Sequence, residues 1–348
     1  MSSNPRITVL MSVYNGEKFL RDAIDSILNQ TYRDFEFVIY DDCSTDNTLN
    51  IIESYNDSRI ICRRNVINRG LTWNLADGVA CSNAEYIVRM DADDIAYPHR
   101  LEQQLEWMDR HPEITIMGTP VSYFHETPGD GGVAPQPQDD ATIKALLFIS
   151  FTMLHPSIII RRQDLVRNKL NYDSSFIYSQ DHALYLECIR AGLKFANYSA
   201  PLLYMRSHNG SISQARHEEQ QECSRRARRA FLDATGIAEQ CNDEEINVYN
   251  AFASGVYPDS VEKVQAYERF VEKIYANPKT TEYFDIEMLR SAMATFFCNS
   301  AYFAIKQKVL YCSSLAGYRS SLRLYASKWP LSMKIKYMFK RIRTLATV

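Results

Sequence analysis

Apolar and polar positions in the first part of the chain follow two alternating periods. Ile7–Val13 is a nearly continuous apolar run, typical of a strand buried on both faces. Behind it, apolar residues recur at helical spacing from Phe19 to Leu28. The alternation continues with expected strands at Phe35–Tyr40, Arg59–Cys62, Glu85–Met90 and Ile114–Gly118, and expected helices at Thr45–Tyr55 (capped by Ser44), Leu71–Ala80 and His99–Arg110. This order predicts an α/β fold with a mostly parallel sheet covered by helices.

The pattern changes after residue 118. Residues 129–137 are too rich in Gly and Pro for regular structure, so we expect either a loop near a functional site or a plain surface connection. A strand is expected at His155–Ile160 and a helix at Asp181–Ala191. From about Ser213 onward the pattern is helical throughout.

Composition limits the class of protein. The chain has 348 residues, of which 46% are hydrophobic, as is ordinary for a globular protein. It contains no run of 18 apolar residues, and its start does not resemble a signal peptide. Its eight cysteines lack metal-site spacing, which argues against a zinc site or a disulfide framework. We therefore expect a cytoplasmic protein.

Polar side chains directly follow three of the expected strands. They lie in the segments Ser12–Asn15, Asp41–Asp42 and Asp91–Asp94. In such sheets, ligands bind beyond the carboxyl ends of the strands. Asp91 and Asp93 offer hard oxygen ligands to Mg²⁺ or Mn²⁺. The alternative is an acidic turn that ends the strand and caps the helix opening near Pro98.

These three motifs, in this order and spacing, resemble the inverting GT-A glycosyltransferases of family 2. The motifs are Val13-Tyr14-Asn15-Gly16-Glu17, Asp41-Asp42-Cys43-Ser44-Thr45-Asp46 and Asp91-Ala92-Asp93-Asp94, and the similarity covers about residues 5–215. Among the branches, the chain most resembles bacterial β-1,3-N-acetylglucosaminyl- and β-1,3-galactosyltransferases of lipopolysaccharide and O-antigen synthesis. The resemblance implies a Rossmann-like GT-A domain over residues 1–212, followed by a helical region over 213–348.

The resemblance also implies a UDP-sugar donor and a role for each motif residue. Ser12, Tyr14 and Glu17 would line the base pocket, and Asp42 would accept a hydrogen bond from uracil N3–H. Arg69 would lie near the base or the phosphates. Asp91 would face the ribose or a metal-bound water, and Asp93 would bind Mn²⁺ or Mg²⁺. Structural alternatives stand beside these roles. Tyr14 would be a half-buried aromatic at a strand end, Asp42 a turn cap, Arg69 a surface partner of a carboxylate, and Glu17 a residue favoured by the helix dipole.

The remaining expected site residues lie further along the chain. Asp181 matches the position of the family's acidic pair, whose first member is replaced by Gln180, and would act as catalytic base. The alternative is that Asp181 caps its helix. His208 would complete the metal shell or be structural, and Arg206 would contact phosphate or order its loop. His155 would face the acceptor or be a satisfied buried histidine.

A strongly basic segment ends the chain. Residues 288–348 contain eleven Lys and Arg and no Asp or Glu, whereas the rest of the chain is acidic. Leu331, Ile335, Met338, Ile342 and Leu345 fall on one helical face. This pattern is typical of a helix lying in a membrane interface, and anionic lipids would add about 1 kcal/mol per cation. The alternative is a helix packed on the protein. Nucleic acid is not an expected partner, because the acidic body would oppose it.

These observations lead to one functional hypothesis with two alternatives. We expect a UDP-sugar-dependent inverting glycosyltransferase, peripheral at the inner face of the cytoplasmic membrane, acting on an oligosaccharide or lipid-linked glycan. A sugar-nucleotide pyrophosphorylase is the first alternative, although the segment from Val13 to Gly16 lacks its Gly-rich basic loop. The second is an inert nucleotide-sugar-binding module. The sugar, acceptor, linkage position and oligomeric state are not determined by the sequence.

Overall fold

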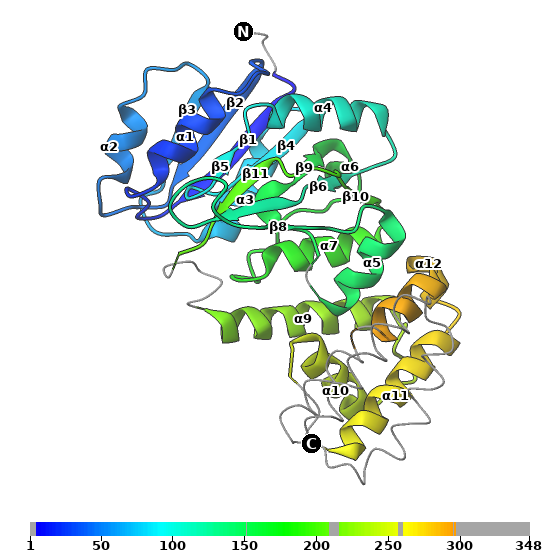
Figure 1. Cartoon of the computed structure of the whole chain (residues 1–348). Helices are drawn as coiled ribbons and strands as arrows, with labels where there is room; N and C mark the ends of the chain where they lie inside the picture. The colour runs from blue at the N-terminus through cyan, green and yellow to red at the C-terminus, as the bar shows by residue number, and fades with distance from the viewer. Residues whose placement is uncertain (1–4, 151, 209–215, 257–259, 295, 297–348) are drawn as a thin grey trace. The chain divides into compact units, whose positions relative to one another are not determined.

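The computed structural model describes residues 5–150, 152–208, 216–256, 260–294 and 296 (Figure 1). The chain divides into two compact units. The first consists of residues 1–147 and 151–227, and the second of residues 148–150 and 228–348. The amphipathic basic segment expected around residues 331–345 lies outside the described residues. Within the described part of the chain, no helix is long and apolar enough to cross a membrane.

A seven-stranded sheet forms the centre of the first unit. Its order is β10-β6-β9-β4-β1-β2-β3. The strands are β1 (Ile7–Val13), β2 (Phe35–Asp41), β3 (Ile60–Arg64), β4 (Tyr86–Met90), β6 (Ile116–Gly118), β9 (Ile159–Arg161) and β10 (Phe195–Asn197). Only β9 runs antiparallel to its neighbours. The expected mostly parallel, helix-flanked GT-A-like fold is confirmed.

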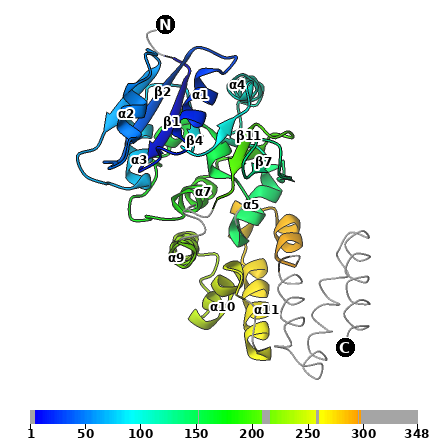
Figure 2. The ribbon, with the colours of Figure 1, turned by 60° about the vertical axis from the view of Figure 1, so that its left-hand side comes forward.

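Helices cover both faces of this sheet. α1 (Leu20–Leu28) and α4 (Arg100–Arg110) bury their apolar residues with the side chains of β1, β2 and β4 that point to one face. α3 (Leu71–Cys81) packs against the other face of β1, and Figure 2 shows α1 and α3 on opposite sides of this strand. Gly78 permits this close approach, because a Cβ atom there would lie 2.4 Å from Leu10 Cδ1.

A second, four-stranded sheet, with order β5-β11-β7-β8, was not expected. Its strands are β5 (Ile95–Ala96), β11 (Leu203–Arg206), β7 (Val121–Phe124) and β8 (Val133–Ala134). β8 lies inside residues 129–137, so the prediction of no regular structure there was wrong. Strand β11 pairs with β5 and β7, which brings residues that follow β11 to the loop between β4 and β5.

Two further expectations were wrong in detail. His155–Ser157 is a short 3₁₀ helix, η1, and β9 begins only at Ile159. Pro156 explains the delay, because it has no N–H to donate to a strand ladder. Ser44 does not cap a helix: α2 (Thr48–Glu53) begins after Asn47, and the Ser44 hydroxyl instead accepts from the Asn15 N–H at 3.0 Å.

The remaining helices of the first unit are α5 (Asp140–Ile149), α6 (Arg162–Arg167) and α7 (Gln180–Arg190). The last residues of α5 belong to the second unit, and α9 (His217–Thr235) begins in the first unit and ends in the second. The second unit continues with α10 (Asp243–Ala253), α11 (Val261–Ala276) and α12 (Thr280–Tyr283). Stacked rings join α10 to α11, with Tyr249 and Phe270 4.4 Å apart. The fully buried Glu245 is neutralised by Lys273 and Arg269. The helical pattern expected after Ser213 is thus confirmed where the structure describes it.

Candidate active site

The candidate site lies at the carboxyl edge of the central parallel strands. β1 lies between β2 and β4, with Val13 opposite Asp41 and Met11 opposite Met90. The three polar segments expected to form a site therefore leave the sheet at the same edge. This edge is where ligands bind in open α/β sheets.

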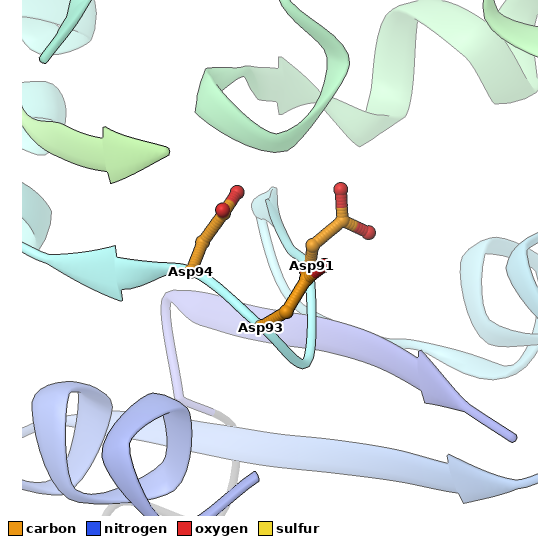
Figure 3. A group of neighbouring side chains, drawn as sticks. All are labelled: Asp91, Asp93 and Asp94. Carbon is orange, nitrogen blue, oxygen red and sulfur yellow. The ribbon is translucent and has the colours of Figure 1, made fainter. Parts of the chain in front are cut away.

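An acidic triplet, Asp91, Asp93 and Asp94, occupies the loop between β4 and β5 (Figure 3). One carboxylate oxygen from each residue lies within 4.8 Å of the others. Figure 3 shows the carboxylates of Asp91 and Asp94 extending to the same side of the loop. His208 joins them from beyond β11, with its Nε2 2.8 Å from Asp93 Oδ2. The expected proximity of Asp93 and His208 is thus present in the fold.

Burial and mutual repulsion alter the protonation of the triplet. Burial, followed by the charge of Asp91, raises the pKa of Asp93. Asp94 is only 2% exposed, and the same two causes, together with Asp93, raise its pKa well above its usual range. Asp94 Oδ2 is buried and has no hydrogen-bond partner among the described residues.

This donor set fits a divalent cation. Clustered carboxylates with one imidazole match the oxygen and nitrogen ligands that Mn²⁺ takes, and the carboxylates alone suit Mg²⁺. A cation would also offset the burial and the mutual repulsion that raise the pKa values of Asp93 and Asp94, and it would provide a partner for Asp94 Oδ2. Asp93 and His208 would be its direct ligands, with Asp91 and Asp94 alongside.

Arg206, at the end of β11, is hydrogen-bonded to the triplet loop, the segment between β4 and β5 that carries Asp91, Asp93 and Asp94. Its guanidinium lies between the rings of Phe19 and Phe124, 4.3 and 4.4 Å from their centroids. Nη2 pairs with Asp22 at 3.0 Å, Nε donates to the Asp93 carbonyl, and the backbone N–H of Arg206 donates to Asp94 Oδ1. These contacts fit the alternative in which Arg206 orders its loop, and a contact with phosphate stays a prediction.

Asp42 lies at the centre of a buried polar network. Its carboxylate accepts from the backbone N–H groups of Arg69 and Gly70 at 2.9 and 2.8 Å and from Asn65 Nδ2 at 2.7 Å. Asn65 also donates to Asn74, and Asn74 donates to the hydroxyl of Ser12. Ser12, Asp42 and the segment before α3 are thereby fixed to one another. Asn65 and Asn74 were missed from the sequence, because single amides give no motif.

The loops after β1 and β2 are bonded together near this network. Glu17 Oε2 accepts from the Asn47 N–H at 2.9 Å, and the Glu17 N–H donates to Asp46. Asn15 adopts a φ of 53° and accepts from the Thr45 N–H. Tyr14 is left 52% exposed, with its ring available to a ligand.

Arg69 lies at the surface on the other side of Asp42. Its guanidinium stacks over the Trp73 ring, 4.3 Å from the centroid. Trp73 was not singled out in the sequence, although it stands four residues from Arg69 in a segment expected to be helical.

Asp181 lies in the first turn of α7, preceded by Ser179 in the left-handed conformation, with a φ of 53°. Asp181 Oδ1 accepts from the His182 N–H at 2.8 Å. Burial raises the pKa of Asp181 to about 6, while two hydrogen bonds and the charge of Arg89 act in the opposite direction. The charge of Asp91 adds to the rise in this pKa.

His155 is buried, as one of the two expectations for this residue stated. Its Nε2 lies 2.8 Å from the Tyr172 hydroxyl. Burial and then the charge of Arg89 lower its pKa well below the ordinary value, so it is neutral. Arg89, itself 1% exposed, acts on several of these groups and was not recognised from the sequence, where it reads as one residue of a strand.

Comparison with known proteins now assigns the family. Residues 8–168 match the model described as "Glycosyl transferase family 2". An uncharacterized glycosyltransferase of Haemophilus influenzae is 31% identical over 254 residues, which cover 68% of this chain and 77% of the relative. The chain belongs to glycosyltransferase family 2.

Other relatives of this glycosyltransferase are more distant. The Escherichia coli protein named UDP-Glc:alpha-D-GlcNAc-diphosphoundecaprenol beta-1,3-glucosyltransferase WfaP is 27% identical over 61% of this chain and 82% of its own. The structure of S. aureus TarS residues 1–349 in complex with UDP-GlcNAc is similar with a TM-score of 0.58 and 18% identity, covering 91% of this chain and 92% of that one. The second comparison agrees with the GT-A fold. The expectation that the chain is a nucleotide-sugar glycosyltransferase is confirmed.

Proposed function

We propose that this glycosyltransferase moves a hexose or N-acetylhexosamine from a UDP-sugar to a hydroxyl of a glycan or glycolipid, with inversion and formation of a β-linkage. The observation that carries the proposal is the acidic triplet with His208 bonded to Asp93 at the carboxyl edge of the central strands. Asp181, at the start of α7, adds a carboxylate whose pKa burial raises to about 6. The triplet and His208 suit a cation that stabilises the leaving diphosphate, and Asp181 suits a base.

The donor base is proposed to bind between Tyr14 and Arg69. The Tyr14 ring offers an exposed face on which uracil can stack. Ser12 and Glu17 position the adjoining loops. An ionised carboxylate has about four acceptor sites, and three N–H groups already occupy the Asp42 carboxylate. One site therefore remains for uracil N3–H.

The diphosphate is proposed to lie over the acidic triplet, with Mn²⁺ or Mg²⁺ held by Asp93 and His208. Asp91 would face the ribose or a water on the cation. A bound cation supplies electrostatic stabilisation of the charge that develops on the diphosphate. Arg206 is assigned to the donor site through its hold on the triplet loop, which keeps Asp93 and Asp94 in place.

Asp181 is proposed to be the catalytic base. The acceptor oxygen attacks the anomeric carbon, the bond from that carbon to the diphosphate oxygen breaks, and the bonding electrons leave with UDP. Asp181 takes the acceptor hydroxyl proton. A base with a pKa near 6 is ionised at neutral pH yet is basic enough to assist this transfer.

The acceptor is proposed to be an oligosaccharide or a lipid-linked glycan, and the linkage β-1,3, in the synthesis of lipopolysaccharide, O-antigen or a related surface polysaccharide. The printed name of the E. coli relative describes a β-1,3 transfer onto a sugar diphosphoundecaprenol, which supports this choice. The basic segment at the end of the chain would bring the enzyme to the anionic inner face of the cytoplasmic membrane.

The test is release of UDP from a panel of UDP-sugars by the purified protein, with Mn²⁺ or with chelator, first without acceptor and then with lipid-linked acceptors. We expect one donor to be turned over in a metal-dependent way. The Asp181→Asn variant should bind that donor but lose transfer. Turnover unchanged in this variant would remove Asp181 as base, and absence of binding to every nucleotide sugar would favour an inert module.

The family assignment argues against the pyrophosphorylase alternative. That reaction needs a Gly-rich basic loop after the first strand. The loop after β1 is instead bonded to the next loop through backbone N–H groups that donate to the Ser44 hydroxyl and to the carboxylates of Asp46 and Glu17.

A further inference from the structure

The segment that carries His208 is bonded along its length to the neighbouring strand of the four-stranded sheet. β11 lies parallel beside β7 (Figure 2), with Arg206 opposite Phe124. The ladder continues past the end of β11, because the Ser207 N–H donates to the Phe124 carbonyl at 2.8 Å. The next side chain is the imidazole whose Nε2 lies 2.8 Å from Asp93 Oδ2. The path of the chain up to this imidazole therefore follows β7.

His125 holds the other backbone group of Ser207. Its Nδ1 lies 3.3 Å from the Ser207 carbonyl oxygen. A carbonyl oxygen can only accept a hydrogen bond, so Nδ1 carries the hydrogen and donates it. Both backbone groups of Ser207 are thus bonded to two consecutive residues at the end of β7. Because Ser207 directly precedes His208, its backbone fixes the point from which the imidazole extends to Asp93.

Asp130 fixes the turn in which His125 lies. One of its carboxylate oxygens accepts from the His125 N–H at 2.9 Å, and the other accepts from the N–H groups of Glu126 and Thr127 at 3.1 and 3.2 Å. The His125 N–H lowers the pKa of Asp130 most, followed by the other two, because hydrogen bonds to the ionised form favour it. Three consecutive N–H groups at the start of the turn therefore converge on one carboxylate.

Gly131 returns the chain to β7. A Cβ atom at this position would lie 2.1 Å from the Tyr123 carbonyl oxygen, so the approach of the two backbones requires glycine. The Tyr123 N–H donates to the Gly132 carbonyl at 2.9 Å, and β8 then pairs with β7. Residues 121–134 thus form a closed hairpin, the β7–β8 hairpin, whose β7 strand also pairs with β11.

We propose that His125 and Asp130 are positioning residues of the cation site: Asp130 orders the turn of the β7–β8 hairpin, and His125 holds Ser207 so that the His208 imidazole meets Asp93. This inference deepens the proposed function and rests on it for the cation that Asp93 and His208 would bind. Both positioning residues act through the backbone of Ser207 and not as ligands.

Hydrogen exchange tests the hold on Ser207 without a cation. His125 and Asp130 are exposed, so replacing them removes their hydrogen bonds without opening a cavity in the core. In the presence of chelator, the Ser207 N–H should exchange about three- to tenfold faster in Asp130→Ala and in His125→Ala, as the net loss of one hydrogen bond predicts. His125→Asn, whose side-chain N–H can take the place of Nδ1–H, should restore the wild-type rate.

Asp285→Ala is the matched control. Asp285 is also exposed, and its carboxylate accepts from the backbone N–H groups of Glu287 and Met288 at 3.0 and 2.9 Å, but it belongs to the second unit. The exchange rate of the Ser207 N–H in this variant should match that of wild type. An unchanged rate in both alanine variants of the hairpin would overturn the proposal, as would an increase of the same size in the control.

The affinity for Mn²⁺ then shows whether the hairpin acts through His208. Binding of Mn²⁺ alone, followed from the electron paramagnetic resonance signal of the free ion, should weaken by at least about threefold in Asp130→Ala, because groups that orient a ligand contribute to metal affinity. In a His208→Ala background, the same substitution should cause no further loss. A loss of equal size in both backgrounds would overturn the role of the hairpin in positioning His208.

The two measurements separate this inference from the proposed function. If the wild-type protein binds Mn²⁺, unaltered affinity in Asp130→Ala overturns the inference and leaves the cation site standing. If the wild-type protein binds no Mn²⁺, the proposed cation site fails, and the exchange rate at Ser207 alone decides whether the hairpin holds the segment that carries His208.

Discussion

At the scale of single residues, the same side chain serves different purposes according to its surroundings. Asp42 is buried and holds three N–H donors, Asp93 is paired with His208, and Asp181 is raised in pKa by burial at the start of a helix. The motifs after the buried strands located Asp42 and Asp93, and the resemblance to the family located Asp181. They did not locate Asn65 or Asn74, whose roles depend on contacts with residues distant in sequence.

The pH dependence of transfer follows from Asp181. Because its pKa is raised to about 6, and a base acts only when deprotonated, kcat/KM should fall about tenfold per pH unit below pH 6. Asp181→Asn should lower kcat by about 10²–10⁴-fold and abolish this acidic limb. Steady-state rates from pH 4.5 to 8 measure both effects. An acidic limb that survives in the asparagine variant would assign the titration to another group.

The cation site predicts a separate effect of His208. His208→Ala removes the imidazole 2.8 Å from Asp93, so the Mn²⁺ concentration for half-maximal activity should rise by at least about tenfold. The affinity for the nucleoside alone should change little. His217→Ala, at an exposed position of α9, is the control. Calorimetry with Mn²⁺ alone checks the result, and equal Mn²⁺ affinity of the two variants would contradict the assignment.

At the scale of elements, length decides what a pattern can predict. The central strands β1, β2 and β4 have five to seven residues of consistent burial, and their positions were expected to within one residue. The strands β5 and β8 have two residues each, too few to show any period. Yet β5 and β11 bring His208 to Asp93, so part of the site rests on elements that the sequence pattern does not show.

The contact between α3 and β1 makes a stability prediction. A Cβ atom at Gly78 would lie 2.4 Å from Leu10 Cδ1 on β1. A side chain there would force α3 or Leu10 to shift, so Gly78→Val should lower the free energy of unfolding by about 2–3 kcal/mol. Ala80→Val, at an exposed position of the same helix, should change it by less than about 1 kcal/mol. Denaturant titration compares the two. Similar losses in both variants would mean that β-branching in the helix, rather than packing on β1, dominates.

At the scale of the whole molecule, the charge is unevenly distributed. The last 61 residues carry eleven Lys and Arg and no acid, on a chain with a net charge of −3. An amphipathic basic segment of this kind favours an anionic bilayer surface. An enzyme proposed to act on lipid-linked acceptors would gain local acceptor concentration from such a surface.

This charge distribution predicts salt-sensitive membrane binding. The full chain should cosediment with vesicles that contain phosphatidylglycerol and should be released as ionic strength rises. Replacing Lys334, Lys336 and Lys340 with Gln should weaken binding by about 1 kcal/mol per residue. The same change at Arg110, Arg167 and Arg190, which are exposed elsewhere, should have a smaller effect. Equal losses would indicate attraction by overall charge rather than by the terminal segment.

The sequence by itself determined the alternation of strands and helices, the sheet edge that carries the site, and the family, because burial periodicity and short motifs are local properties of the chain. The tertiary structure decided which distant groups meet. It paired His208 with Asp93, engaged Arg206 with Phe19 and Phe124, and closed the network around Asp42. Such pairings depend on chain topology and burial, which set both the distances and the pKa values, and no local pattern encodes them.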